Sequence, residues 1–231
     1  MHIAGLQKMT LLDYPGVVAC TVFLGGCNFR CPFCHNPDLV SGPFPEPFIT
    51  EEEFFLFLEE RKGFLDGVCI TGGEPMANPD LEPFIREIRA RGLLVKLDTN
   101  GSFPDRLERV VEERLVDYVA MDIKNSRERY GPTIGLPGYD TRDIERSAAI
   151  LMGGALPYEF RTTLVREFHT EQDMLAIGKW LKGCRAYCLQ SFVDSGNLLG
   201  KEVMTPFSEE EMMLHKKLLK SYIRAISIRG V

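Results

Sequence analysis

Short apolar runs recur along the chain at intervals that suit the strands of a sheet. They cover residues 17–23, 67–70, 93–98, 118–124, 158–165 and 186–189, with a shorter run at 225–228. Each run has the length of a strand and is rich in residues that form β-structure. The pattern therefore predicts six strands and a shorter seventh near the end of the chain.

Helix signals stand between these runs. Residues 50–53, Thr-Glu-Glu-Glu, form a capping-box pattern. Asn78-Pro79 gives the start of a second helix, which continues through apolar residues at helical spacing until Gly92 ends it. Thr170 and Ser208 begin two later segments of the same kind. We expect a helix at each of these places.

The alternation of strand and helix, about six times over, predicts βαβ units and a parallel sheet. Right-handed crossovers would curl that sheet into a full or partial TIM-like barrel of the α/β class, and a doubly wound open sheet is the competing topology. We expect a single domain over residues 1–231, with its core at about 17–190 and a C-terminal helix and strand at 208–228. The proline-rich stretch 43–47 is expected to be a loop.

Charged residues at every second position of the predicted strands favour the barrel. Residues two apart in a strand point to the same side of the sheet. Because unpaired charges are costly to bury, several on one inner face indicate a polar lumen that holds a ligand. The alternative is a network of ion pairs that neutralise one another inside an ordinary barrel. The groups that share a face are Lys96 with Asp98, Asp122 with Lys124, and Glu159 with Arg161 and Thr163.

Composition narrows the class of function. The chain carries 27 Lys and Arg against 33 Asp and Glu, a net charge of −6, which argues against a nucleic-acid surface. Its apolar stretches are far shorter than the roughly 20 residues that a membrane helix needs. Residues 1–16 lack the basic and apolar regions of a signal peptide. We therefore expect a cytoplasmic protein.

A cysteine-rich loop follows the first predicted strand. Cys27, Cys31 and Cys34 have the spacing C-x3-C-x2-C, so three thiolates lie within eight residues. Such a loop can hold an iron–sulfur cluster and leave one iron open for a ligand. Zinc held with His35 as a fourth ligand is the alternative, and three unrelated core cysteines are another. The remaining cysteines, Cys20, Cys69, Cys184 and Cys188, are expected to be structural.

This loop resembles the signature of the radical S-adenosylmethionine (SAM) superfamily, in which an aromatic residue, here Phe33, precedes the last cysteine. The resemblance implies a partial (β/α)6 barrel and a [4Fe–4S] cluster on Cys27, Cys31 and Cys34. It also implies that the open iron chelates SAM, and that one electron breaks the sulfonium C–S bond to give methionine and a 5′-deoxyadenosyl radical. In such enzymes the protein binds, orients and excludes water.

Three further motifs fit the same resemblance. Residues 71–75, Thr-Gly-Gly-Glu-Pro, are similar to the motif that binds the SAM amino group, although the same residues also make an ordinary turn. Asn100 belongs to a stretch that lines the SAM site in activating enzymes, or to a tight turn. A monovalent cation is implied at Asp98, Thr99 and Asp122, and Lys124 or Arg161 would pair with the SAM carboxylate. The resemblance thus places at the SAM site Phe33, Gly72, Gly73, Glu74, Asp98, Asn100, Asp122, Lys124 and Arg161.

Taken together, the motifs between residues 26 and 163 resemble the activases of glycyl-radical enzymes, and most of all those of anaerobic ribonucleoside-triphosphate reductase. The resemblance implies a protein substrate, from which the radical takes a hydrogen of one glycine, and flavodoxin or ferredoxin as electron donor. Relatives that activate pyruvate formate-lyase carry a histidine where this chain has residues 189–192, Leu-Gln-Ser-Phe. The alternatives are an activase of pyruvate formate-lyase or another glycyl-radical enzyme, a radical SAM enzyme acting on a small molecule, and a zinc-binding barrel without activity.

Overall fold

The computed structural model describes residues 1–42 and 48–230. The expected proline-rich loop at 43–47 lies outside the described residues. Contacts divide the chain into two compact units, the first formed by residues 1–28, 38–99 and 103–120 and the second by residues 29–37, 100–102 and 121–231. The expectation of a single domain stays a prediction.

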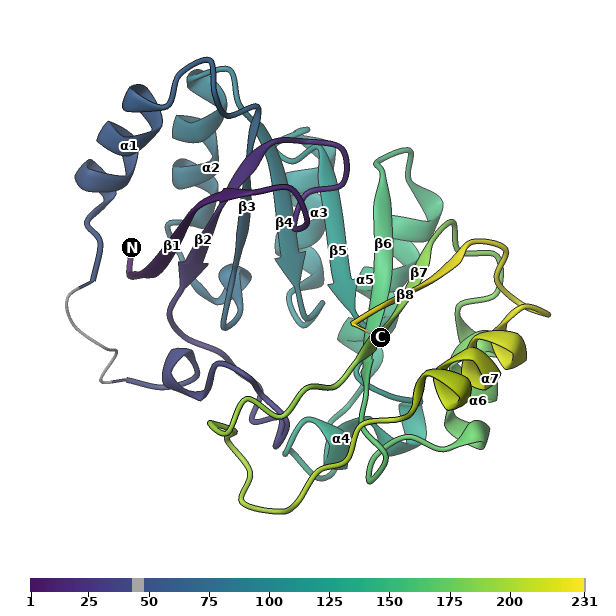
Figure 1. Cartoon of the computed structure of the whole chain (residues 1–231). Coiled ribbons are helices and arrows are strands. Elements are labelled where there is room, and N and C mark those ends of the chain that lie inside the picture. Colours follow the sequence, from purple (N-terminus) through teal and green to yellow (C-terminus); the bar gives the residue numbers. More distant parts are fainter. Residues whose placement is uncertain (43–47, 231) are drawn as a thin grey trace. The chain divides into compact units, whose positions relative to one another are not determined.

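The first unit is built on strands in chain order. These strands are β1 (Ile3–Thr10), β2 (Ala19–Leu24), β3 (Gly67–Gly72) and β4 (Leu94–Thr99). β1 runs antiparallel to β2, and β2, β3 and β4 are parallel (Figure 1). The register places Thr21 beside Cys69, and Cys69 beside Lys96. β5 (Tyr118–Asp122) begins in this unit and ends in the second.

The α-helices in the described part of the first unit are α1 (Glu51–Glu60), α2 (Leu81–Ala90) and α3 (Pro104–Glu112). Thr50 caps α1 in the predicted capping box. The predicted start of α2 at Asn78-Pro79 is wrong by two residues, because the chain first makes the 3-10 turn η2 (Pro75–Ala77), with Asn78 at its end. The expected stop is confirmed, since Gly92 follows the helix with φ at 79°.

The second unit repeats the alternation. Its strands β6 (Tyr158–Leu164), β7 (Tyr187–Ser191) and β8 (Ile226–Arg229) are parallel and follow chain order. Its helices are α4 (Tyr130–Thr133), α5 (Arg142–Gly153), α6 (Glu171–Trp180) and α7 (Glu209–Leu219), and α6 and α7 lie side by side (Figure 1). Short 3-10 turns occur at η1 (Pro37–Leu39) and η3 (Arg127–Arg129).

The strand and helix predictions are largely confirmed. Every predicted strand is present, with ends displaced by at most two residues, and capping boxes open α6 and α7 at Thr170 and Ser208. In neither unit does the strand order reverse, as it would in a doubly wound sheet. β1, α3, α4 and α5 were not predicted. Among the described residues, no helix has the length and apolar character to cross a membrane.

Candidate active site

The cysteine loop begins in the first unit with Cys27 and continues in the second with Cys31 and Cys34. Cys27 and Cys34 are half-buried, and Cys31 is 9% exposed. All seven cysteines lie in the described residues, and none forms a disulfide. None of the three loop thiols is therefore taken up by a disulfide.

In the first unit, the start of the loop packs on the turn after β3. Cys27 N donates to Val40 O at 3.1 Å, and Glu74 N donates to Gly26 O at 2.7 Å. A Cβ at Gly72 would lie 2.2 Å from Leu24 O, and one at Gly73 would lie 2.2 Å from Gly26 O. The two glycines are thus required for close approach to the chain's own backbone, and their approach to a ligand stays a prediction.

Glu74 is fully buried at the end of this turn. Its Oε1 accepts from Met76 N at 3.0 Å, which caps η2, and from Thr99 Oγ1 at 2.9 Å. The carboxylate therefore ties the turn after β3 to the end of β4.

β4 carries an ion pair between a buried lysine and Asp98. Lys96, only 1% exposed, forms an ion pair with Asp98 and lies 3.5 Å from Cys69 Sγ. The two residues share a face as predicted, and they neutralise each other in the way that the ion-pair alternative expected. Cys69 and Cys20 are fully buried, as expected for core cysteines.

In the second unit, a turn closes between the other two thiols. Cys34 N donates to Cys31 O at 3.0 Å. Phe33, between them, is buried against the rings of Phe168 and His169, with centroids at 5.6 and 6.5 Å. The aromatic residue of the signature therefore anchors this half of the loop.

An ion-paired cluster of Asp122, Lys124 and Arg161 belongs to the same unit. Asp122 Oδ2 accepts from Lys124 Nζ and Asp122 Oδ1 from Arg161 Nε, both at 2.9 Å. Burial alone would raise the pKa of Asp122, but Arg161 and then Lys124 outweigh it and lower that pKa to about 2. Burial would likewise lower the pKa of Lys124, yet the Asp122 carboxylate and then the Cys31 thiolate raise it above its ordinary value. The Asp122 carboxylate thus keeps Lys124 charged, and the Cys31 thiolate lies close enough to add to this effect.

Asn100 forms a local turn in the second unit. Its Oδ1 accepts from Ser102 N at 3.0 Å and Ser102 Oγ at 2.6 Å. Gly101 follows with φ at 78°, which glycine adopts without strain. The tight turn that the sequence left open is therefore present, and the SAM contact of Asn100 stays a prediction.

Two residues around Lys124 were missed by sequence reasoning. The Tyr130 hydroxyl accepts from Lys124 N at 3.3 Å. His169 Nδ1 accepts from Val165 N, which leaves Nε2 to donate to Lys124 O at 2.8 Å. Both side chains are buried. Neither stands in a motif, so only the folded chain reveals them.

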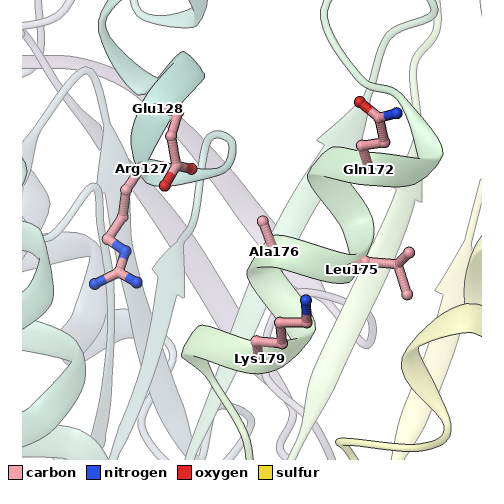
Figure 2. A pocket seen from close by; sticks show the side chains of 6 residues that line it. All are labelled: Arg127, Glu128, Gln172, Leu175, Ala176 and Lys179. Atoms are coloured by element: carbon pink, nitrogen blue, oxygen red, sulfur yellow. The ribbon is translucent and has the colours of Figure 1, made fainter.

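The described residues contain no group of three or more His, Cys, Asp or Glu side chains arranged to hold a metal ion. A cavity of about 370 Å³ lies at the surface beside α6 (Figure 2). It is lined by Arg127, Glu128, Gln172, Leu175, Ala176 and Lys179, a set that contains none of the predicted site residues.

Comparison with known proteins decides the family. A model of the radical SAM superfamily matches residues 21–181, which include the whole cysteine loop and all of the predicted cofactor residues. The chain belongs to the radical SAM superfamily. The cysteine signature and the strand order agree with this membership, and the radical SAM fold is confirmed.

Two relatives of this radical SAM protein are both named as activating enzymes. A Methanocaldococcus jannaschii protein named as a candidate glycyl-radical enzyme activating enzyme is 30% identical over 235 residues, which cover 99% of this chain and 96% of that protein. The pyruvate formate-lyase-activating enzyme of Staphylococcus aureus is 27% identical over 192 residues, which cover 78% of this chain and 75% of that protein.

The fold also occurs in solved structures of the superfamily. A radical SAM methyltransferase from Sphaerobacter thermophilus superposes with a TM-score of 0.72 at 14% identity, covering 96% of this chain and 68% of that chain. At this identity the likeness concerns the fold alone.

Proposed function

We propose that this radical SAM protein is an activase that removes a hydrogen atom from the α-carbon of one glycine in a partner glycyl-radical enzyme. The observation that carries the proposal is the match to the M. jannaschii protein, which is 30% identical and covers 99% of this chain and 96% of that protein. We take anaerobic ribonucleoside-triphosphate reductase as the first partner to test, because the motifs between residues 26 and 163 are most similar to its activase.

The donor set fits an iron–sulfur cluster. Cys27, Cys31 and Cys34 are thiols outside any disulfide, and two of them are half-buried at the loop surface. Thiolates are the ligands of such clusters. When bound, the cluster and SAM supply the reducing electron and the 5′-deoxyadenosyl radical that takes the hydrogen.

The protein's own residues would bind and orient SAM. Lys124 and Arg161 offer cations to its carboxylate, and Asp122 holds both side chains in place. We assign the SAM ammonium to the turn after β3, where Glu74 carries the carboxylate and Gly73 lets the turn pack on the cysteine loop. The other proposed contacts of SAM are Phe33, Gly72, Asp98 and Asn100.

The proposal also includes a monovalent cation at Asp98, Thr99 and Asp122, and flavodoxin or ferredoxin as electron donor. Replacing K⁺ by tetramethylammonium, which is too large for such a site, should slow SAM cleavage. An unchanged rate would remove the cation from the proposal.

The test is anaerobic incubation with SAM, a reductant and a candidate partner, read by electron paramagnetic resonance for the doublet of a glycyl radical. Cys31→Ala should abolish the doublet, because two thiolates do not hold the cluster. Cys184→Ala is the matched control, since Cys184 is a buried cysteine outside the loop, and it should keep the signal. A full doublet from Cys31→Ala would contradict the ligand assignment.

The identity of the partner is tested in parallel reactions with the reductase and with pyruvate formate-lyase. A doublet on the reductase alone supports our assignment, and a doublet on the lyase alone overturns it while leaving the activase chemistry intact. SAM cleavage that depends on a metabolite and needs no partner protein would overturn the activase proposal.

A further inference from the structure

The segment between β7 and α7 returns to the cysteine loop at two points. We call residues 192–204 the strap. At its start, the buried ring of Phe192 is stacked on His35, with centroids 5.6 Å apart and planes 20° apart. Further along, Gly200 N donates to Pro32 O at 2.8 Å. Pro32 lies within the turn from Cys31 to Cys34 and His35 directly follows it, so the strap contacts this part of the loop at two points.

The contact at Gly200 leaves no room for a side chain. A Cβ there would lie 2.7 Å from Pro32 Cβ and 2.8 Å from Met204 Cε. The φ of Gly200 is not in the left-handed region, so space rather than backbone conformation requires the glycine. The strap is therefore shaped to lie directly on the cysteine loop.

The far end of the strap is anchored in the same unit. Met204 is buried, and Thr205 beyond it exchanges two hydrogen bonds with the turn after β6. Thr205 O accepts from Arg166 N at 3.0 Å, and Thr205 N donates to Glu167 Oε2 at 2.9 Å. Phe168 of that turn is the residue that packs on Phe33. The cysteine loop is thus held by two segments that are bonded to each other.

Residues that orient metal ligands from outside change how well the metal is retained. We propose that Phe192 and Gly200 are positioning residues, which hold Pro32 and His35 and so restrict the positions that Cys31 and Cys34 take when they bind the cluster. The inference rests on the proposed function only in taking the cluster as the ligand of these thiols. The strap would thus fix the cysteine loop in addition to the packing of Phe33 on Phe168.

The test measures iron loss rather than activity. The anaerobically reconstituted proteins are mixed with a strong ferrous chelator, and iron release is followed at a temperature equally far below each protein's own melting point. Phe192→Ala should release iron about 10-fold faster than the wild type. Gly200→Ala should act in the same direction, and the resonance spectrum of the reduced cluster should broaden in both.

Phe207→Ala is the matched control. Phe207 also packs on a histidine, edge-on to His215 with ring centroids 4.7 Å apart, but His215 lies on α7 rather than in the cysteine loop. Its loss should lower stability and leave iron release at the wild-type rate. If Phe192→Ala does not fold, Phe192→Leu keeps apolar bulk without the stacked ring, and it should still release iron faster than the control.

The outcomes separate the two proposals. Equal release from the Phe192 and Phe207 variants would overturn the positioning role while the cluster assignment stands. A wild-type protein that takes up no cluster would overturn the proposed function, and this inference with it.

Discussion

Gly72 and Gly73 lie so close to neighbouring backbone in the first unit that a side chain would not fit at either position. Gly72 has φ at 131°, and both residues would place a Cβ within 2.2 Å of a backbone oxygen. The neighbours are Leu24 and Gly26, at the end of β2 and the start of the cysteine loop. Backbone packing therefore excludes a side chain here whether or not SAM is bound.

Replacing Gly73 by alanine should destabilise the apoprotein by about 3 kcal/mol, because the backbone of Gly26 cannot move away without disturbing Cys27. Urea unfolding measures the change. Gly153→Ala is the control, since Gly153 is helical and a Cβ there meets nothing within 4 Å. That variant should change stability by less than about 1 kcal/mol, toward stabilisation. Similar losses in both variants would contradict the packing argument.

Asp122 gives a prediction on acid stability. Its pKa in the folded protein is about 2, below the ordinary 3.8. A carboxyl with a lowered folded pKa contributes stability above its unfolded pKa and loses it as the pH falls through the folded value. The wild type should therefore lose about 2 kcal/mol more than Asp122→Asn between about pH 5 and pH 2. Urea unfolding at a series of pH values tests this, and parallel profiles would count against it.

The residue types of the site were predictable, but their partners were not. Spacing alone indicated Cys27, Cys31 and Cys34, and alternation put Asp122 and Lys124 on one face. By contrast, the Phe192–His35 stack joins residues more than 150 positions apart in the chain. No local pattern encodes such a pair, because it depends on where two loops meet after folding.

Helix starts differ in how much sequence information they carry. Thr50, Thr170 and Ser208 each have an acidic residue three positions later, and the structure confirms a reciprocal capping box at all three. Asn78-Pro79 carries a comparable signal, but no helix begins at these two residues. There, Glu74 caps a 3-10 turn first, and α2 starts later at Leu81.

Caps with and without side-chain bonds should differ in energy. Thr50→Ala removes the acceptor of Glu53 N and should destabilise the protein by about 1 kcal/mol. Asp80→Ala, at the cap of α2, should cost much less, because Asp80 makes no side-chain cap bond. Thermal unfolding of the two apoprotein variants compares them. Equal effects would contradict the assignment of the energy to the side-chain cap bond.

The elements that were not predicted have either a weak sequence pattern or a pattern that the prediction left out of account. β1 is an edge strand whose second half, Gln7 to Met9, is exposed, so its apolar pattern is broken. Two of the missed helices do carry a signal: α3 has a proline in its first turn, and α5 buries Ile144, Ala148 and Leu151 on one stripe. These two could have been predicted from spacing.

At the scale of the whole chain, the order of strands was the most predictable feature. Successive βα units of similar length leave few other topologies open, and within each unit the strands lie in that order. The division of contacts into two units was not predictable, because no linker or change of composition marks it.

The distribution of thiols gives a test on the whole chain. In the folded apoprotein only the half-buried Cys27 and Cys34 should react quickly with a thiol reagent, because Cys20, Cys31, Cys69, Cys184 and Cys188 are buried. Burial also raises the pKa of Cys20 and of Cys184 to about 12, which keeps both protonated. Unfolding in urea should make all seven react. Fast reaction of more than two thiols in the native state would contradict the burial of the others.

The two glycines after β3 have an evolutionary consequence. Since Leu24 and Gly26 forbid side chains there, a descendant that had abandoned its iron and its sulfonium ligand would be under the same steric pressure to retain Gly-Gly. In a genome survey, that dipeptide would therefore mark ancestry, and the presence of the thiols would separate working catalysts from inactive descendants.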